Sequence, residues 1–190
     1  IADINILSGG SPYISLRSRD PIAFYLAGAT ATSEQQQVTE IAIYQLEEKA
    51  ISEDTVRLDL MADNGVKNVI SNSPDKQALW GIASGLPQMP SSSEAIVSAV
   101  YSVGAMAQQN PGTTVQAIIA TTGTSDKEAI EQISAATMSI AELPNFRIAV
   151  VGVTPANRAP LSNGFSSLSN RVQFATSEHE IAVLFESFGE

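Results

Sequence analysis

Three predominantly apolar runs of residues constrain the fold of this chain more than any other feature of its sequence. They cover residues 21–27 (PIAFYLA), 115–120 (VQAIIA) and 147–153 (RIAVVGV). Runs without polar alternation are typical of strands that are buried on both faces of a parallel sheet. Such a sheet needs helices on both faces, so the runs predict an α/β domain.

Helical patterns separate these runs and supply the covering layers. Apolar residues recur at helical spacing over residues 34–49, 95–109, 127–143 and 178–188. Side chains that can cap a first turn precede each segment: Ser33, the serines 91–93 with Glu94 in a pattern close to a capping box, Ser125 or Asp126, and Ser177. Right-handed connections then place helices on both faces of the sheet.

An antiparallel edge hairpin is expected after the first helix. Residues 55–61 alternate in polarity, residues 63–65 (DNG) are a turn signal, and residues 67–70 form the return strand. A short helix near residues 76–82 and a short strand at 171–175 complete the order. The expected fold is a doubly wound, mostly parallel sheet with helices on both faces and one antiparallel edge strand.

The remaining segments are harder to assign from their pattern. Residues 1–20 are expected to be a lead-in strand or linker, and residues 21–190 the domain. Residues 154–170 are polar and are expected to form a long loop that holds a short helical turn. Trp80 is expected to plug the end of the core, with an exposed interface anchor as the alternative.

Charge and composition exclude several function classes. The net charge is -10 over 190 residues, and no basic stripe is present to neutralise phosphates, so we expect no nucleic-acid partner. No apolar run approaches the roughly 20 residues of a membrane-spanning helix, so we expect no membrane insertion. The low charged fraction of 16% slightly favours an extracytoplasmic or cell-surface location. Because the chain begins with Ile1 rather than Met, we expect it to be part of a longer protein.

Ligands of such sheets bind at the carboxyl ends of the strands, near the point where the strand order reverses. Three loops therefore matter, at residues 27–33, 89–94 and 121–126. Their order resembles the metal-site loops of von Willebrand factor A domains, and the resemblance covers residues 21–188. That family carries a D-x-S-x-S loop, then a threonine before the central helix, then an aspartate in a T-D-G turn.

The residues of this chain depart from those motifs at every acidic position. Ala27, Ala29 and Ala31 fall on the D-x-S-x-S trio in one register, and Gly28, Thr30 and Thr32 do so in the other. The threonine position falls at residues 90–92, and the T-D-G turn reads Thr121-Thr122-Gly123. The resemblance therefore implies a degenerate metal-ion-dependent adhesion site.

Magnesium needs hard oxygen ligands that usually include carboxylates, so we expect neither a metal nor another cofactor. Asp126 and Glu94, the nearby acids, are better explained as first-turn residues of helices. The resemblance then leaves a set of binding candidates by position alone: Thr30, Thr32, Ser33, Ser91, Ser92, Thr122, Gly123 and Asp126.

Catalytic patterns are weak, so we expect no enzyme. The phosphate-binding glycine motifs and the G-x-S-x-G elbow are absent, and His179 is interpreted as a solvated first-turn residue. The acid pairs Glu47-Glu48, Glu53-Asp54 and Glu178/Glu180 are interpreted as solvated charge, while Arg158 and Arg171 could meet an acidic partner.

The sequence therefore favours a non-enzymatic protein-interaction or adhesion-type module, whose partner it does not identify. The alternative is a small-molecule or nucleotide-binding domain that uses the same strand-end crevice. A third possibility is a structural module that packs against neighbouring domains of its own chain.

Overall fold

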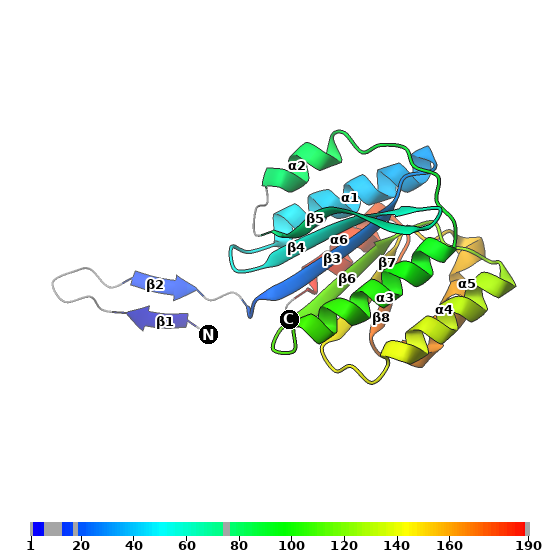
Figure 1. Cartoon of the computed structure of the whole chain (residues 1–190). Helices are drawn as coiled ribbons and strands as arrows, with labels where there is room; N and C mark the ends of the chain where they lie inside the picture. Colours follow the sequence, from blue (N-terminus) through cyan, green and yellow to red (C-terminus); the bar gives the residue numbers. More distant parts are fainter. Residues whose placement is uncertain (1, 6–12, 17–18, 74–76, 189–190) are drawn as a thin grey trace.

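A six-stranded sheet organises the computed structural model, which describes residues 2–5, 13–16, 19–73 and 77–188 (Figure 1). The strand order is β5-β4-β3-β6-β7-β8. Neighbouring strands are parallel except for β5, which runs antiparallel to β4 at one edge. The strands are β3 (Ile22–Ala29), β4 (Thr55–Ala62), β5 (Gly65–Ser73), β6 (Thr114–Ala120), β7 (Phe146–Val151) and β8 (Val172–Ala175). The predicted fold class is confirmed.

Helices cover both faces of this sheet, as Figure 1 shows. One face packs against α1 (Ser33–Lys49), α2 (Gln77–Ala83) and α6 (Glu178–Glu186). The other packs against α3 (Glu94–Gln109), α4 (Lys127–Ile140) and α5 (Pro155–Gly164), which is followed by a short 3-10 turn, Ser166–Leu168. Within the described residues, no helix is long and apolar enough to span a membrane.

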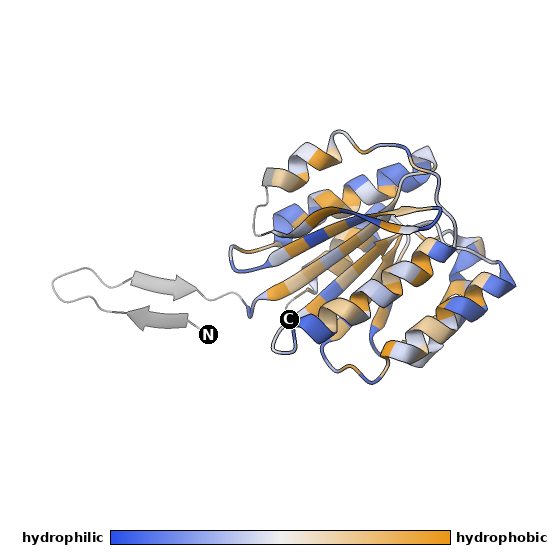
Figure 2. Cartoon of the chain, viewed as in Figure 1, coloured by the Kyte–Doolittle hydropathy of each residue, from blue (hydrophilic) through white to orange (hydrophobic). Residues whose placement is uncertain are grey.

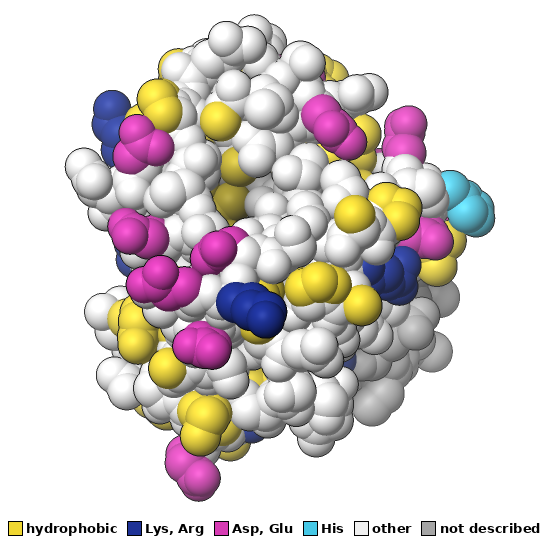
Figure 3. Space-filling view, turned by 90° about the vertical axis from the view of Figure 1, so that its right-hand side faces the viewer, with side chains coloured by type: hydrophobic (Ala, Val, Ile, Leu, Met, Phe, Trp, Pro, Cys, Tyr) yellow, Lys and Arg dark blue, Asp and Glu magenta, His cyan; other side chains and the backbone are white. Residues whose placement is uncertain are grey.

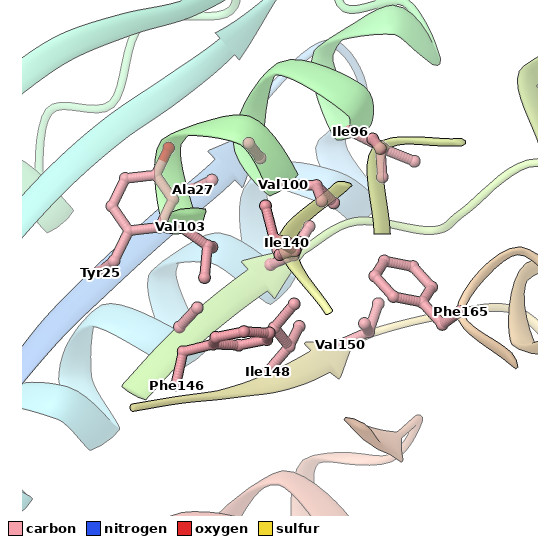
Figure 4. Packing of buried hydrophobic residues seen from close by; sticks show 14 of the residues in the cluster. Tyr25, Ala27, Ile96, Val100, Val103, Ile140, Phe146, Ile148, Val150 and Phe165 are labelled. Carbon is pink, nitrogen blue, oxygen red and sulfur yellow. The ribbon is translucent and has the colours of Figure 1, made fainter. Parts of the chain in front are cut away.

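The two apolar cores follow directly from the alternation of side chains along the strands. Figure 4 shows the core under α3 and α4, where Tyr25 of β3, Val103 of α3 and Phe146 of β7 lie in one cluster. Phe24 and Leu26 point to the opposite core with Leu58 of β4. Figure 2 shows the apolar strands at the centre of the domain and a hydrophilic interruption within β4.

The N-terminal segment contains two strands of its own. β1 (Ala2–Asn5) and β2 (Tyr13–Leu16) form an antiparallel two-stranded sheet with Ala2 opposite Leu16. Residues 6–12 and 17–18 lie outside the described residues. The predicted lead-in segment therefore includes a hairpin.

Three local predictions about helices are wrong. Thr32 rather than Ser33 caps α1, in a capping box with Gln35. Ser93 precedes α3 in a helical conformation and makes no side-chain capping bond, so the predicted box with Glu94 does not form. The polar segment after β7 is not a loop with one turn, because α5 occupies ten of its residues despite the internal Pro160. Asp126 and Ser177 do cap α4 and α6.

The chain enters and leaves the sheet at the same end. β3 begins there, and the ring of Phe188, just after α6, lies 6.2 Å from the ring of Phe24. The carboxyl ends of the parallel strands, and hence the predicted site loops, lie at the opposite end (Figure 1).

Candidate functional site

The strand order reverses between β3 and β6, because the chain proceeds from β3 outward to β4 on one side and later from β6 to β7 on the other. Open α/β sheets bind their ligands at such a switch point. Figure 3 looks onto this end of the molecule, where a central recess with hydrophobic side chains at its floor is bordered mostly by uncharged side chains and backbone, with acidic side chains gathered to one side of it.

The loop after β3 presents hydroxyl groups that already have partners. Thr30 is fully buried, and its Oγ1 accepts a hydrogen bond from the backbone N–H of Met89 at 3.2 Å. Thr32 is exposed, but its Oγ1 accepts the N–H of Gln35 at 3.2 Å as the cap of α1. Ser33 is exposed in the first turn of α1.

In the register that begins at Ala27, the strand positions that would carry metal ligands face the core and not the site. Ala27 and Ala29 are fully buried in the apolar core beneath α3. A polar or charged side chain at either position would therefore be placed among apolar groups, which is costly without a partner. The two alanines serve packing.

The loop before α3 is fixed against the β4–β5 turn. Ser92 donates from Oγ to the backbone carbonyl of Asp63 at 2.8 Å. Ser91 is half-buried beside it, and Thr30 fixes Met89 from the other side. A cleft of about 320 Å³ lies next to this loop, lined by residues that include Asp63, Gly65, Met89 and Pro90.

The loop after β6 is held by a compact set of hydrogen bonds. Thr121 accepts the N–H of Gly123 on its Oγ1 at 3.1 Å. The carbonyl of Thr122 accepts a hydrogen bond from the side-chain amide of Asn157 at 3.0 Å. The Oγ1 of Thr122 accepts a second one from the side-chain amide of Gln35 at 3.4 Å. The second bond joins this loop to α1, and so to the loop after β3.

Backbone geometry and a helix cap complete the loop. Gly123 has a φ of +85°, a conformation that other residues rarely adopt. Asp126 is exposed and accepts the N–H of Ala129 on its carboxylate at 2.9 Å, as expected of an N-cap. Its carboxylate thus has a structural role in α4.

These positions form a mainly uncharged polar surface, with Asp126 as their single carboxylate and without a set of metal ligands. Within the described residues, no group of three or more His, Asp or Glu side chains could hold a metal ion. Of the acids in these loops, Asp126 caps α4 and Glu94 begins α3, and hydroxyls without carboxylates compete poorly with water for a divalent ion. The arrangement suits recognition of polar groups by hydrogen bonds.

Sequence reasoning missed a buried polar cluster on β4. Asp59 is 0% exposed, and its carboxylate accepts bonds from the phenol of Tyr25 at 2.9 Å and from Asn68 at 2.7 Å. Arg57 forms an ion pair with it at 3.1 Å. Burial, and then the Asp59 charge, raise the pKa of the Tyr25 phenol above its ordinary range. The cluster is internally satisfied and joins three strands.

Several other predicted roles are corrected by the structure. Asp54 is buried and pairs with Arg19, so it is not part of a solvated charge face. Trp80 is 56% exposed and does not plug the core. Arg171 lies over the ring of Phe146 at 4.6 Å and donates to backbone carbonyls, so its guanidinium serves the fold.

His179 is exposed in the first turn of α6, Arg158 is exposed on α5, and both line a pocket together with Glu180. Arg158 donates to Thr176 at 3.4 Å.

Comparisons with known proteins place the fold. No family model matches the chain, and no curated protein matches it by sequence. Among solved structures, the chain is similar to a von Willebrand factor type A protein from Catenulispora acidiphila, with a TM-score of 0.68 and 14% identity over 90% of this chain and 42% of that one. This chain thus spans less than half of that protein.

Two further structures show the same likeness. The PilB minor pilin from Streptococcus sanguinis has a TM-score of 0.61 and 11% identity over 92% of this chain and 62% of that chain. An aerotolerance-related membrane protein from Bacteroides fragilis has a TM-score of 0.60 and 11% identity over 88% of this chain and 95% of that chain. At these identities the likeness concerns the fold and not the activity.

Proposed function

We propose that this chain, whose fold is von Willebrand factor A-like, is a non-enzymatic module that binds another protein through the carboxyl-end face of its sheet. The binding is independent of a metal ion. One observation carries the proposal: the loop hydroxyls at the switch point are fixed by partners within the protein, while no carboxylate occupies the three positions where the family places its metal site.

A surface of this kind favours docking for a physical reason. Side chains and backbone that are already ordered lose little further conformational entropy when a partner binds. Thr32 is exposed and Thr122 is half-buried, and each accepts one hydrogen bond on its Oγ1, so each keeps its own O–H donor for a polar group of a partner. The surface therefore offers specificity without a bridging ion.

Site-specific photocrosslinking tests the location of binding. A photoreactive residue replaces Ser33 or Ser125, both exposed on this face, and in the control replaces Gln109, which is exposed at the far end of α3. The variants are made in cells that naturally produce the protein. We expect one partner protein to crosslink from the two serine positions and not from Gln109. Equal labelling from all three positions would contradict the proposal.

Affinity measurements with that purified partner test the mechanism. Ser33→Arg buries an unpaired charge in the interface and is expected to weaken binding by about tenfold or more, whereas Gln109→Arg leaves the affinity unchanged. Excess EDTA is expected to have no effect on the Kd. In parallel, magnesium and manganese are expected to leave the Tm unchanged; a metal-dependent rise would show that an ion is bound.

The cleft beside Met89 and the central recess favour a second candidate function, the binding of a small molecule or nucleotide at the strand ends. Such pockets in α/β sheets are usually lined by apolar groups with a few convergent polar ones. A Tm screen against nucleotides and small polar metabolites separates the two functions. A saturable, nucleotide-dependent rise that Gly123→Val abolishes would favour the ligand function over protein docking.

A further inference from the structure

An exposed aromatic pair lies on the helical layer away from the strand-end face. Trp80 of α2 is 56% exposed and Tyr44 of α1 is 37% exposed, and their ring centroids are 4.9 Å apart. Figure 1 shows α1 and α2 side by side along one face of the sheet. Tryptophan and tyrosine in this state are enriched where proteins bind other proteins, because they bury much area at little entropic cost.

The surface next to Trp80 is open to a partner. Gly81 follows Trp80 in the exposed part of α2, and among the described residues a Cβ at Gly81 would meet nothing within 4 Å. On the inner side of the same helix, Leu79 and Ala83 are buried in the core. The helix is therefore anchored by its apolar side and presents the indole ring outward on a fixed support.

Two acidic side chains flank Tyr44 along α1. Glu40 and Glu48 lie four residues before and four residues after Tyr44, so both are on the same stripe of α1. The ion pairs among the described residues are Arg19–Asp54 and Arg57–Asp59, and neither glutamate takes part in one. The face of an indole ring is itself the most favourable aromatic site for a cation.

We propose that the surface formed by Trp80, Tyr44, Glu40 and Glu48 binds a basic segment of a partner protein, with an arginine or lysine side chain over the exposed indole. The ring supplies apolar area and a cation–π contact, and the two carboxylates complement the charge of the segment. Acidic partners and anionic membranes are repelled by the same carboxylates.

This surface is separate from the strand-end face. Tyr44 is eleven residues after Ser33 along α1, a rise of about 16 Å at the usual helical spacing. Binding here does not require the proposed function to be correct, and variants at the two surfaces distinguish the two.

Trp80 is the single tryptophan of the chain, so its fluorescence reports on this surface directly. The probe is a short synthetic peptide of alternating arginine and glycine, titrated into the intact protein at low ionic strength. We expect a saturable change in Trp80 emission that weakens as salt is added, because exposed charges are screened. A matched peptide of alternating glutamate and glycine is expected to give no change.

Matched variants separate this surface from the general acidity of the chain. A labelled peptide replaces tryptophan fluorescence as the readout. Trp80→Ala is expected to weaken binding about tenfold, while Tyr101→Ala, which removes another exposed aromatic side chain on α3, has no effect. Glu40→Gln with Glu48→Gln is expected to weaken binding about threefold, and the equal charge change Glu128→Gln with Glu131→Gln on α4 leaves it unchanged.

Three outcomes would overturn the proposal. One is equal weakening by the two double variants, which would mean that only net charge matters. Another is a change in Trp80 emission on dilution alone, which would assign the surface to a second copy of this chain. The third is binding of phosphatidylcholine vesicles without binding of the basic peptide, which would assign it to a lipid surface.

Discussion

Replacement of Asp54 by alanine is expected to destabilise the domain strongly. Asp54 is 2% exposed and lies just before β4. Its carboxylate accepts the backbone N–H of Ile22 at 2.8 Å and that of Ile51 at 2.8 Å. It also forms a bidentate pair with the guanidinium of Arg19, whose side chain is 9% exposed. One carboxylate thus joins the start of β3, the end of α1 and the segment before β3.

The magnitude follows from what the substitution leaves behind. Asp54→Ala leaves two backbone N–H groups and the nearly buried guanidinium of Arg19 without their hydrogen-bond acceptor. Removal of one partner of a buried ion pair costs about 3–5 kcal/mol, because the other charge remains desolvated. Unsatisfied backbone donors act in the same direction, at about 1–3 kcal/mol each when water cannot reach them. Because all these bonds end on one carboxylate, their costs overlap and do not add, and we expect a loss of about 4 kcal/mol in the free energy of unfolding.

Urea unfolding followed by circular dichroism measures this loss. With an m-value of about 2 kcal/mol/M for a domain of this size, the midpoint falls by about 2 M. Asp20→Ala, which removes an exposed carboxylate of the same residue type, is expected to change stability by less than about 0.5 kcal/mol. A loss below about 1 kcal/mol for Asp54→Ala would refute the reasoning, since it would mean that water replaces the carboxylate.

Three further outcomes are expected. Gly152→Ala should cost about 3 kcal/mol in a urea series, because Gly152 has a φ of +85° and an added Cβ would lie 2.4 Å from Val38; Val38→Ala in the same background should recover part of the loss. Tyr25→Phe should cost about 1–2 kcal/mol by removing the bond to the buried Asp59 carboxylate, and thermal unfolding that matches the wild type would contradict that bond. The backbone N–H groups that precede α6 lower the pKa of the Glu180 carboxyl below its ordinary value of 4.5. The stability that Glu180 contributes is therefore present above its pKa in the unfolded chain and is lost as the pH falls through its lower pKa in the folded protein. A carboxyl-carbon NMR titration that gives Glu180 a pKa at or above 4.5 would contradict this expectation.

The predominantly apolar runs predicted the sheet well, because the pattern that marks a buried strand lies within the residues of the strand itself. The runs at β3, β6 and β7 lie in adjacent central strands, where both faces are covered. The DNG turn predicted the β4–β5 hairpin for the same local reason. Elements that are specified by their own residues were therefore accessible from the sequence.

The burial and pairing of side chains that have partners far away in the sequence could not be predicted. Asp59 alternates with Leu58 and Leu60, and the pattern gave no sign that its face of the sheet is also buried beneath α3. Its partner Tyr25 is 34 residues away, so only the parallel pairing of β3 with β4 brings them together. Asp54 was misinterpreted for the same reason, since Arg19 is equally remote in sequence.

Trp80 shows a different limit. Tryptophan side chains are usually well buried, which favoured a place in the core for Trp80. In the structure, Leu79 and Ala83 of the same helix occupy the core instead. The candidate hydroxyl groups were predicted only in part. The strand order indicated where they lie, but their hydrogen bonds within the protein depend on contacts between loops, which the sequence pattern does not show. Their role in binding stays a prediction.

The position of the chain ends has a consequence for engineering. Because Phe188 and Phe24 are in ring contact, a short linker from the end of α6 to the start of β3 would close the domain into a circle with little strain. A circularly permuted chain opened at the exposed residues near Gly112 would retain every strand pairing of the sheet. The same geometry would allow the domain to be inserted into a surface loop of a carrier protein with its strand-end loops pointing away from the carrier.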